Sequence, residues 1–426
     1  MRTLLCLLAS LLLVLPASAG QWPGFRGPTG QGQTADRKLP LHWNAESNLL
    51  WKTPIPGSGW SSPVVWDDRV FVTTTRESGA QCHVLCLDRK DGRVLWDQRV
   101  FEQVPRRKEG KNSYATPTPV TDGRQVYAVF GDGSVAALAC RDGQIAWTNR
   151  EIHFYSRHGL GASPILHEGL VIMPYDGSNP VAAAGSYPNN TQEERLGWQI
   201  PWDKAFIAAF DTQTGRRVWT ARRGRSRIAH VTPLIQRAHG REQLLSVAGD
   251  VVQGFNPRTG ERLWSVYCQG EGVVPMPVLG DGVVFTASGY EKTTLRAIRT
   301  DGSGEVTGTH IAWEQKKGVP SQSSLLYRKP HVYAVTDGGI ATCYAEDSGA
   351  IVWQERLGGN YSASPVAADD RAYFLNEAGE TVVITLGPTF QILARNPLGE
   401  KCQASMAVAN HRLFIRTEKN LVCIGQ

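Results

Sequence analysis

The residue types that most often carry out chemistry are present in this sequence, but not in the arrangements that catalysis usually needs. The ten histidines include no His-x-x-x-His or His-x-His pair, the spacings that let two imidazoles share one metal ion. There is no Gly-x-Ser-x-Gly turn for a serine nucleophile and no glycine-rich phosphate loop of the P-loop type. The residues alone therefore assign no catalytic group and predict no metal ion and no cofactor.

Four acidic residues fall within one loop-like segment: Asp176, Glu193, Glu194 and Asp203. Carboxylates gathered in this way can bind Ca²⁺ or exchange protons with a substrate. Acidic residues in exposed loops are more often simply solvated. Both interpretations stay open on the sequence.

Basic residues gather in four segments: Arg106, Arg107, Lys108 and Lys111; Arg150, Arg157 and His158; Arg222, Arg223, Arg225 and Arg227; Lys316 and Lys317. If these segments meet on one face, they favour an anionic ligand or an acidic partner. The alternative is a solvated surface. The formal net charge of +6 over 426 residues is only mildly basic and does not indicate nucleic-acid binding.

Tryptophans end a series of similar segments such as "TGERLW" and "DGRVLW". They are Trp51, Trp96, Trp147, Trp219, Trp264, Trp313 and Trp353, with Ala394 in the eighth place. Their spacing is 40 to 51 residues, apart from one interval of 72 residues before Trp219. That period is typical of a four-stranded propeller blade. The tryptophans are predicted to be structural, forming the joints between blades.

Each repeat reads as short β-branched or apolar runs separated by Gly, Asp and Asn turns, and no long segment has a helical period. The last repeat has only three such runs, whereas "NLLWKTPIP" near the start carries a tryptophan with no strand before it. An N-terminal strand that completes the last blade would close the ring and leave no open edge. We therefore predict an all-β, eight-bladed propeller.

The cysteines support this alignment of the repeats. Cys86, Cys343 and Cys423 occupy one repeat position, where other blades carry Ala or Gly, as expected for close packing. Cys82 and Cys86 would lie roughly 13 Å apart on one strand, and a disulfide needs Cα atoms within about 7 Å. We expect the cysteines to be small buried residues without a metal or redox role.

The chain divides into four parts. Residues 1–19 read as a secretory signal, with Arg2, an apolar run and the small residues of "ASA". Residues 20–44 form a tail containing "WPGFRGP", which we expect to plug or buttress one face. Residues 45–426 form the propeller, with an insert at about 175–205. The mature chain should be exported, periplasmic or extracellular, not lipidated and monomeric, with no transmembrane segment.

The repeats ending in Gly-x-x-x-Trp, with "QWPGFRGPTGQG", "GTHIAW" and "GGNYSASPV", resemble exported β-propeller proteins with PQQ-like repeats. This superfamily includes quinoprotein alcohol dehydrogenases and the outer-membrane assembly factor BamB, both eight-bladed. The resemblance implies the fold, and for the dehydrogenases it implies PQQ held on Ca²⁺ next to a disulfide of adjacent cysteines. This chain has no Cys-Cys pair and lacks matching ligands, so no catalytic residue is carried over. It also lacks the lipidated cysteine of BamB.

Loops between blades and loops between second and third strands emerge on the same side, which we call the upper face. The 72-residue interval places its insert there as well. The predicted ligand or partner face consists of Trp60, Arg107, Lys111, Tyr114, Arg157, His158, Trp198, Trp202, Arg225, Arg227, His230, Lys317 and Tyr361. Trp60, Tyr114, His230 and Tyr361 are expected to ring the channel mouth.

The first functional hypothesis is a non-catalytic exported propeller that binds an anionic ligand or an acidic partner through this basic face. The second, from repeat similarity alone, is a PQQ-dependent oxidoreductase. The third is a carbohydrate-binding or carbohydrate-cleaving protein, given the loop aromatics. Cleavage would need two carboxylates about 5–10 Å apart in the channel mouth.

Overall fold

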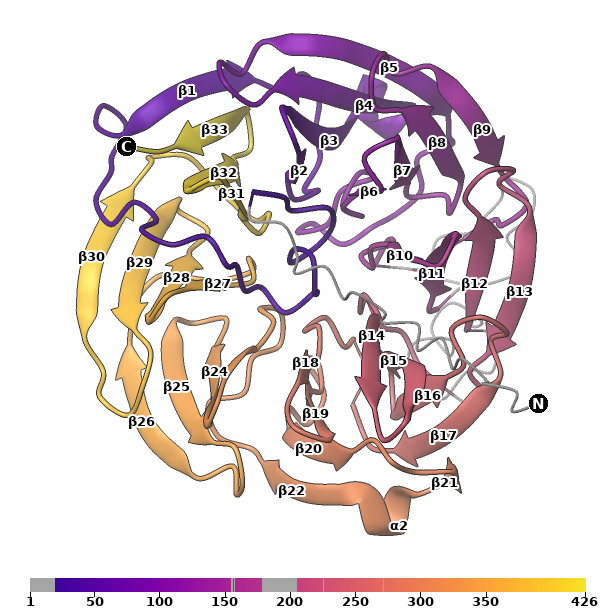
Figure 1. The fold of residues 1–426 in the computed structure, drawn as a ribbon, viewed down its shortest axis with the longest axis vertical. Helices are drawn as coiled ribbons and strands as arrows, with labels where there is room; N and C mark the ends of the chain where they lie inside the picture. Colours follow the sequence, from indigo (N-terminus) through magenta and orange to yellow (C-terminus); the bar gives the residue numbers. More distant parts are fainter. Residues whose placement is uncertain (1–19, 155, 157, 178–204, 225, 271) are drawn as a thin grey trace, which may run out of the picture.

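A computed structural model describes residues 20–426 except 155, 157, 178–204, 225 and 271. Eight sheets stand around a central axis, with one edge strand of each sheet nearest the axis (Figure 1). The prediction of an all-β, eight-bladed propeller is confirmed. Within the described ranges, no helix is long and apolar enough to cross a membrane.

The strands are given from the innermost outward. Blade 1 contains β2 (Val64–Trp66), β3 (Arg69–Arg76), β4 (Gln81–Asp88) and β5 (Val94–Glu102), and blade 2 contains β6 (Val120–Thr121), β7 (Gln125–Val129), β8 (Val135–Ala139) and β9 (Ile145–Asn149). Blade 3 contains β10 (Ile165–His167), β11 (Leu170–Tyr175), β12 (Phe206–Asp211) and β13 (Arg217–Arg222), and blade 4 contains β14 (Leu234–Ala238), β15 (Arg241–Ala248), β16 (Val251–Phe255) and β17 (Arg262–Tyr267).

Blade 5 contains β18 (Val278–Leu279), β19 (Val283–Ala287), β20 (Leu295–Arg299) and β22 (Ile311–Gln315), and blade 6 contains β23 (Leu326–Arg328), β24 (His331–Val335), β25 (Ile340–Ala345) and β26 (Ile351–Arg356). Blade 7 contains β27 (Val366–Ala368), β28 (Arg371–Leu375), β29 (Glu380–Thr385) and β30 (Ile392–Pro397), and blade 8 contains β31 (Ala407–Ala409), β32 (Arg412–Arg416), β33 (Asn420–Ile424) and β1 (Leu49–Pro54). Three short elements complete the set: η1 (Glu77–Gly79), α2 (Thr307–His310) and β21 (Gly304–Glu305), which pairs in parallel with β17.

The ring closes through the N-terminal strand β1. It pairs antiparallel with β33, so the eighth sheet has the order β1-β33-β32-β31. In Figure 1 the first strand of the chain and the last one lie side by side. Because residues from both ends share one sheet, no blade is left with a missing outer strand.

The repeated tryptophan sits opposite a small residue of the neighbouring strand in its own blade. Trp96 faces Cys86 and Trp264 faces Gly254, for example. The complete set of partners is Cys423, Cys86, Ala137, Ala209, Gly254, Ala297 and Cys343. The small residues therefore make room for the indole, which explains the repeat position that the cysteines share.

The same tryptophan also contacts the next blade, which makes it a joint. A Cβ added to Gly143 would lie 2.8 Å from the ring of Trp96. The indole Nε1 of Trp96 donates to the Cys140 carbonyl at 3.1 Å. The turn glycine of a motif thus receives the tryptophan of the preceding blade. Trp51, Trp147, Trp219 and Trp313 contact the following turn glycine in the same way.

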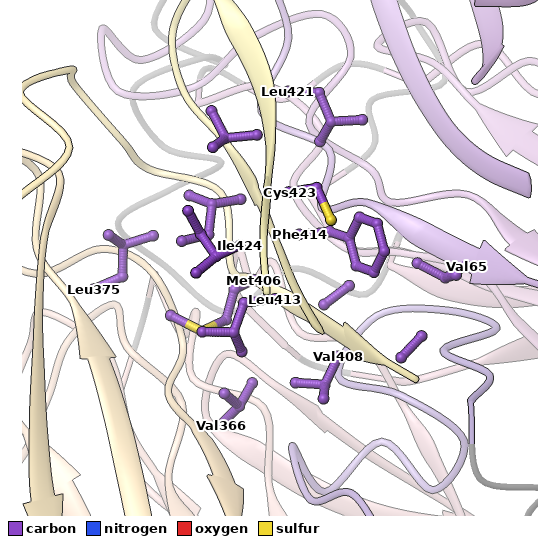
Figure 2. Close-up of a cluster of buried hydrophobic side chains, with 14 of the residues drawn as sticks. Val65, Val366, Leu375, Met406, Val408, Leu413, Phe414, Leu421, Cys423 and Ile424 are labelled. Atoms are coloured by element: carbon purple, nitrogen blue, oxygen red, sulfur yellow. The ribbon is translucent and has the colours of Figure 1, made fainter. Parts of the chain in front are cut away.

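Apolar side chains fill the spaces between neighbouring blades. Figure 2 shows this for blade 8: Phe414 points toward Val65 of blade 1, whereas Leu413 points toward Val366 of blade 7. Successive residues of a strand face opposite sides, so one strand contributes to two interfaces. All seven cysteines of the described part are free thiols, and all but Cys268 are buried. Burial raises the pKa of Cys268 to about 11.

Candidate functional site

The channel wall is built from two residues of each blade, just before the inner strand begins. The lower layer holds Ser62, Thr118, Ser163, Thr232, Met276, Ser324, Ser364 and Ser405. The upper layer holds Trp60, Thr116, Gly161, His230, Val274, Gln322, Ser362 and Gln403. Residues two apart in an extended chain face the same side, which explains the constant spacing. All of them except Met276 and Ser324 line one cavity of about 650 Å³, a size typical of ligand sites.

The hydroxyls of the lower layer tie neighbouring blades together. The backbone N–H of Ser62 donates to Thr118 Oγ1, that of Thr118 to Ser163 Oγ, and that of Ser163 to Thr232 Oγ1, each at 2.9 Å. Each oxygen accepts from the blade before it. This ring of neutral dipoles is a built feature of the fold and was not predicted from the sequence.

The chain of hydrogen bonds continues on the other side of the axis. The N–H of Met276 donates to Ser324 Oγ at 3.0 Å, that of Ser324 to Ser364 Oγ at 3.2 Å, and that of Ser364 to Ser405 Oγ at 2.8 Å. Met276 replaces the hydroxyl in blade 5 and interrupts the ring. A sequence signal existed: a Ser-Pro or Thr-Pro pair precedes the inner strand in five blades, as at Ser62 and Thr232.

The tail residues close the cavity at its lower end. Phe25 lines the cavity, and Trp22 is fully buried and exchanges two backbone hydrogen bonds with Val65 of β2, at 2.8 and 2.9 Å. The tail also pairs with β27, where Ala367 N–H donates to the Gly32 carbonyl at 2.8 Å. Figure 1 shows this indigo segment crossing the middle of the ring before it reaches β1. The "WPGFRGP" segment therefore plugs the channel and turns it into a blind cavity.

Arg26 anchors this plug. Its guanidinium is fully buried and donates to the carbonyls of Gly30, Gln31 and Leu325, the last of which belongs to blade 6. Burial lowers the pKa of Arg26 to about 9. Because this value is still above 7, the guanidinium is charged at neutral pH. Gly27 has φ +82°, and a Cβ there would lie 2.8 Å from the Trp22 ring, so the turn requires glycine.

The rim of the cavity carries charges of both signs. Glu109 and Lys111 line it, and Lys111 forms a 2.7 Å ion pair with Glu377. Tyr290 is an exposed aromatic side chain at the rim. The described rim is mixed in charge, where the sequence had led us to expect a basic one.

Two histidines lie on the cavity wall with ring centroids 6.0 Å apart: His158 and His230. Burial, and then the proximity of His158, lowers the pKa of His230 to about 3. His230 is therefore neutral at physiological pH and offers one donor and one acceptor to the cavity. A Cβ on Gly161 would lie 2.9 Å from His230 Cβ, so the missing side chain in blade 3 leaves space for this ring.

Four of the predicted face residues meet in the cavity: Trp60, Lys111, His158 and His230. Four others cannot be placed, because Arg157, Trp198, Trp202 and Arg225 lie outside the described residues, as do the signal segment and most of the insert.

The remaining predicted residues lie elsewhere. Arg107 and Tyr114 line a separate small pocket, and Lys317 is exposed without lining the cavity. Arg227 pairs with Asp250 at 2.5 Å. Tyr361 was expected at the channel mouth, but it is fully buried in the core. Its neighbour Ser362 faces the cavity instead, since a shift of one residue moves a side chain to the other side of a strand.

Much of the positive charge expected on the upper face is neutralised within the fold. Arg223 forms a buried ion pair with Asp176, and Arg150 pairs with Asp132 at 3.3 Å. Asp176, which we considered as a Ca²⁺ ligand or an acid–base group, is fully committed to Arg223. Glu193, Glu194 and Asp203 lie outside the described residues.

One group of metal-ligand side chains exists within the described ranges: His167, Glu168 and Glu242. Arg258 binds both carboxylate oxygens of Glu168 at 2.5 and 2.7 Å, and Arg237 binds Glu242 at 2.7 Å. Two guanidiniums that already neutralise two carboxylates make this a salt-bridge cluster rather than a cation site. It is not part of the cavity.

The donor set of the cavity does not fit a quinone held on Ca²⁺. Calcium takes six to eight oxygen ligands, several of them carboxylates. Among the described lining residues, Glu109 is the single carboxylate, and none is a cysteine. The same single carboxylate lacks the partner that glycoside cleavage would need.

Comparison with known proteins gives a consistent fold. The family model described as "Outer membrane protein assembly factor BamB" matches residues 41–186, 202–303 and 300–387. No curated protein matches the sequence. BamB from Moraxella catarrhalis aligns with a TM-score of 0.60 at 15% identity, covering 89% of this chain and 97% of that chain. A europium-containing methanol dehydrogenase aligns with a TM-score of 0.67 at 11% identity, covering 94% and 90%. Identities this low establish the shared fold and leave activity to the site.

Proposed function

Because the chain belongs to the family described as outer membrane protein assembly factor BamB, we propose that it is an exported, non-catalytic propeller that binds its ligand or partner at the upper face. The observation that carries the proposal is the blind cavity of about 650 Å³. All eight blades contribute one residue to the upper layer of its wall, and six of them contribute one to the lower layer. Few arrangements on a rigid scaffold are better suited to hold a ligand in one orientation.

The chemistry of the wall supports binding without catalysis. Its described side chains are hydroxyls, amides, aromatics, a few aliphatic groups and two histidines, with Glu109 and Lys111 at the rim. Except for Ser62, the lower hydroxyls accept hydrogen bonds from backbone N–H groups, and no described histidine bonds to any of them. A nucleophile activated by a base needs such a contact. The hypothesis of a PQQ-dependent oxidoreductase also rests on similarity of the repeats. The described lining of the cavity, however, lacks the set of oxygen ligands that Ca²⁺ needs.

The mixed rim also changes the expected partner. A partner that covers the mouth would meet Lys111 and Glu109 together with the exposed Tyr290. One aromatic side chain and two opposite charges restrict the orientation of a bound partner more than a uniformly basic surface does. A protein partner or a small polar ligand fits it better than a polyanion such as nucleic acid.

The test is a thermal-shift screen of organic acids, neutral and acidic saccharides and short peptides against the wild-type protein and a blocked variant. Gln403→Trp fills the cavity without removing a hydrogen bond, because no described residue bonds to the Gln403 side chain. Glu355→Trp on the exposed face of β26 is the matched control. Compounds that stabilise the wild type and Glu355→Trp but not Gln403→Trp support the cavity. A complete absence of such compounds, or turnover of a bound one, contradicts the proposal.

The quinone alternative has its own measurement. Purified protein is mixed with PQQ, with and without Ca²⁺, and absorbance and melting temperature are followed. We expect no Ca²⁺-dependent change in either. A Ca²⁺-dependent spectral shift would replace the binding proposal with the oxidoreductase one.

A further inference from the structure

The lower layer of the cavity presents hydrogen-bond donors that have no acceptor among the described residues. In Thr118, Ser163, Thr232 and Ser405 the hydroxyl oxygen already accepts a backbone N–H. Ser62 makes no side-chain hydrogen bond within the described chain, although its side chain is buried. The O–H of each of these hydroxyls is therefore available to donate a hydrogen bond to a group inside the cavity.

The backbone N–H groups strengthen these donors. A hydroxyl oxygen that accepts one hydrogen bond becomes a better donor of its own hydrogen, since the two bonds polarise one another. Four hydroxyls of this kind, together with that of Ser62, come from blades 1 to 4 and from blade 8 and line one cavity from several sides. Preorganised neutral donors that line the same space stabilise a negatively charged oxygen group bound there. A sugar hydroxyl, which needs acceptors as well, leaves most of them unmatched.

Two buried guanidiniums that are not part of the cavity lining add positive charge without a carboxylate partner in the described residues. Arg26 lies beside Phe25 in the floor and bonds only to carbonyls. Arg416 is buried and donates to Ser61 Oγ at 2.8 Å and to the Thr73 carbonyl at 2.5 Å. Neither has a carboxylate partner in the described part of the chain. A buried charge without a counter-charge is costly, and a nearby anion offsets that cost.

The upper layer supplies the rest of a binding site. Trp60 lines the cavity above Ser62, and Tyr290 lines its rim. The side-chain oxygen of Gln403 is buried there without a hydrogen-bond partner. The aromatic side chains and the unpaired Gln403 oxygen suit the body of a small ligand that carries a hydroxyl or an N–H group.

We propose that the hydroxyl ring is an oxyanion subsite, which receives a carboxylate, sulfate or phosphate group of a small ligand whose body lies between Trp60 and Tyr290. This inference rests on the proposed function and names the ligand class of the same cavity. The donors are neutral, so selection depends on their geometry and on the two buried arginines. The subsite needs no metal ion.

The experiment compares matched pairs of sugars that differ only in charge: glucuronate against glucose, and glucose 6-sulfate against glucose, by isothermal titration with the full chain. We expect the anionic member of at least one pair to bind at least tenfold tighter than glucose. Ser62→Ala should weaken its binding about tenfold, the range for a hydrogen bond to a charged group, because it removes a donor that supports no other contact. Thr118→Ser keeps the hydroxyl and should leave the affinity within twofold.

The outcomes separate this inference from the proposed function. Equal binding of both members of each pair, or unchanged affinity in Ser62→Ala, overturns the oxyanion subsite and leaves the cavity as a binding site for neutral ligands. Binding of neither member overturns the subsite too, and the fate of the proposed function then depends on the Gln403→Trp screen. Ser348→Ala, at an exposed turn, controls for nonspecific effects and should match the wild type.

Discussion

Arg223 and Asp176 form a bidentate ion pair in the interior of the propeller. Nε of Arg223 donates to one carboxylate oxygen, and Nη2 donates to the other at 2.8 Å, with both side chains fully buried. The same Nη2 donates to Ser246 Oγ of blade 4 at 2.8 Å. The pair therefore joins the ends of β11 and β13 in blade 3 to the next blade.

Asp176→Asn should be strongly destabilising, because it leaves the buried Arg223 charge without a counter-charge. We expect a loss of about 3–5 kcal/mol in the free energy of unfolding, measured by urea denaturation. Asp281→Asn is the control: Asp281 pairs with Lys329 on the surface at 3.5 Å and should change nothing measurable. Equal effects of the two substitutions would contradict the role given to the buried pair.

Gly27→Ala tests the packing of the N-terminal plug. The residue has φ +82°, and its new Cβ would meet the Trp22 ring at 2.8 Å. Gly240 has a similar φ of +70° but no atom within 4 Å of its Cβ position. Gly27→Ala should therefore cost about 1–3 kcal/mol more than Gly240→Ala, which reports the backbone cost alone. Thermal melts of both variants make the comparison, and equal shifts would rule out tight packing of the plug.

Tryptophans of the joints and of the cavity should respond differently to truncation. Trp264 is 1% exposed and donates to Gln243 Oε1 at 2.8 Å. Its replacement by Ala should cost about 3–5 kcal/mol. Trp60→Ala opens the cavity wall and should cost less than about 1.5 kcal/mol, while abolishing binding of any ligand found for the cavity. If Trp60→Ala proves as destabilising as Trp264→Ala, Trp60 is part of the core.

His230 should make the protein less stable in acid. Its pKa of about 3 in the folded protein lies below the ordinary value of 6.5, chiefly because of burial. Between those two pH values the unfolded chain binds a proton that the folded chain does not. Stability therefore falls as pH drops below about 6.5, by at most about 1.4 kcal/mol per pH unit from this residue.

His230→Gln should flatten this part of the stability profile, measured by urea denaturation from pH 7 to pH 4. His158, Lys111 and Glu109 also line the cavity, so each point needs the wild type measured alongside. His153→Gln, at an exposed position, should leave the slope unchanged. A wild-type slope in His230→Gln would show that other groups cause the acid sensitivity.

The pattern of the chain was sufficient for the fold but only partly for the site. The spacing of tryptophans such as Trp96 and Trp353 predicts the blades, and the small residue opposite each one was visible as a repeat position. Trp60 and His230 were also found, because each lies just before an inner strand. Tyr361 was placed wrongly, because the parity of a strand cannot be read where the strand is only three residues long, as in β27 (Val366–Ala368).

What the sequence determined by itself is the repeating element. Four short strands and a tryptophan per period follow from alternation and turn chemistry, which act over a few residues. What only the tertiary structure decided is the cavity. The upper layer of its wall takes one position from each blade, from Trp60 to Gln403, and its floor comes from the tail. The tertiary structure also decided that the Arg223 side chain pairs with Asp176 and does not reach solvent. Residues so far apart meet only when the ring closes, so no local pattern reveals which side chains face one another.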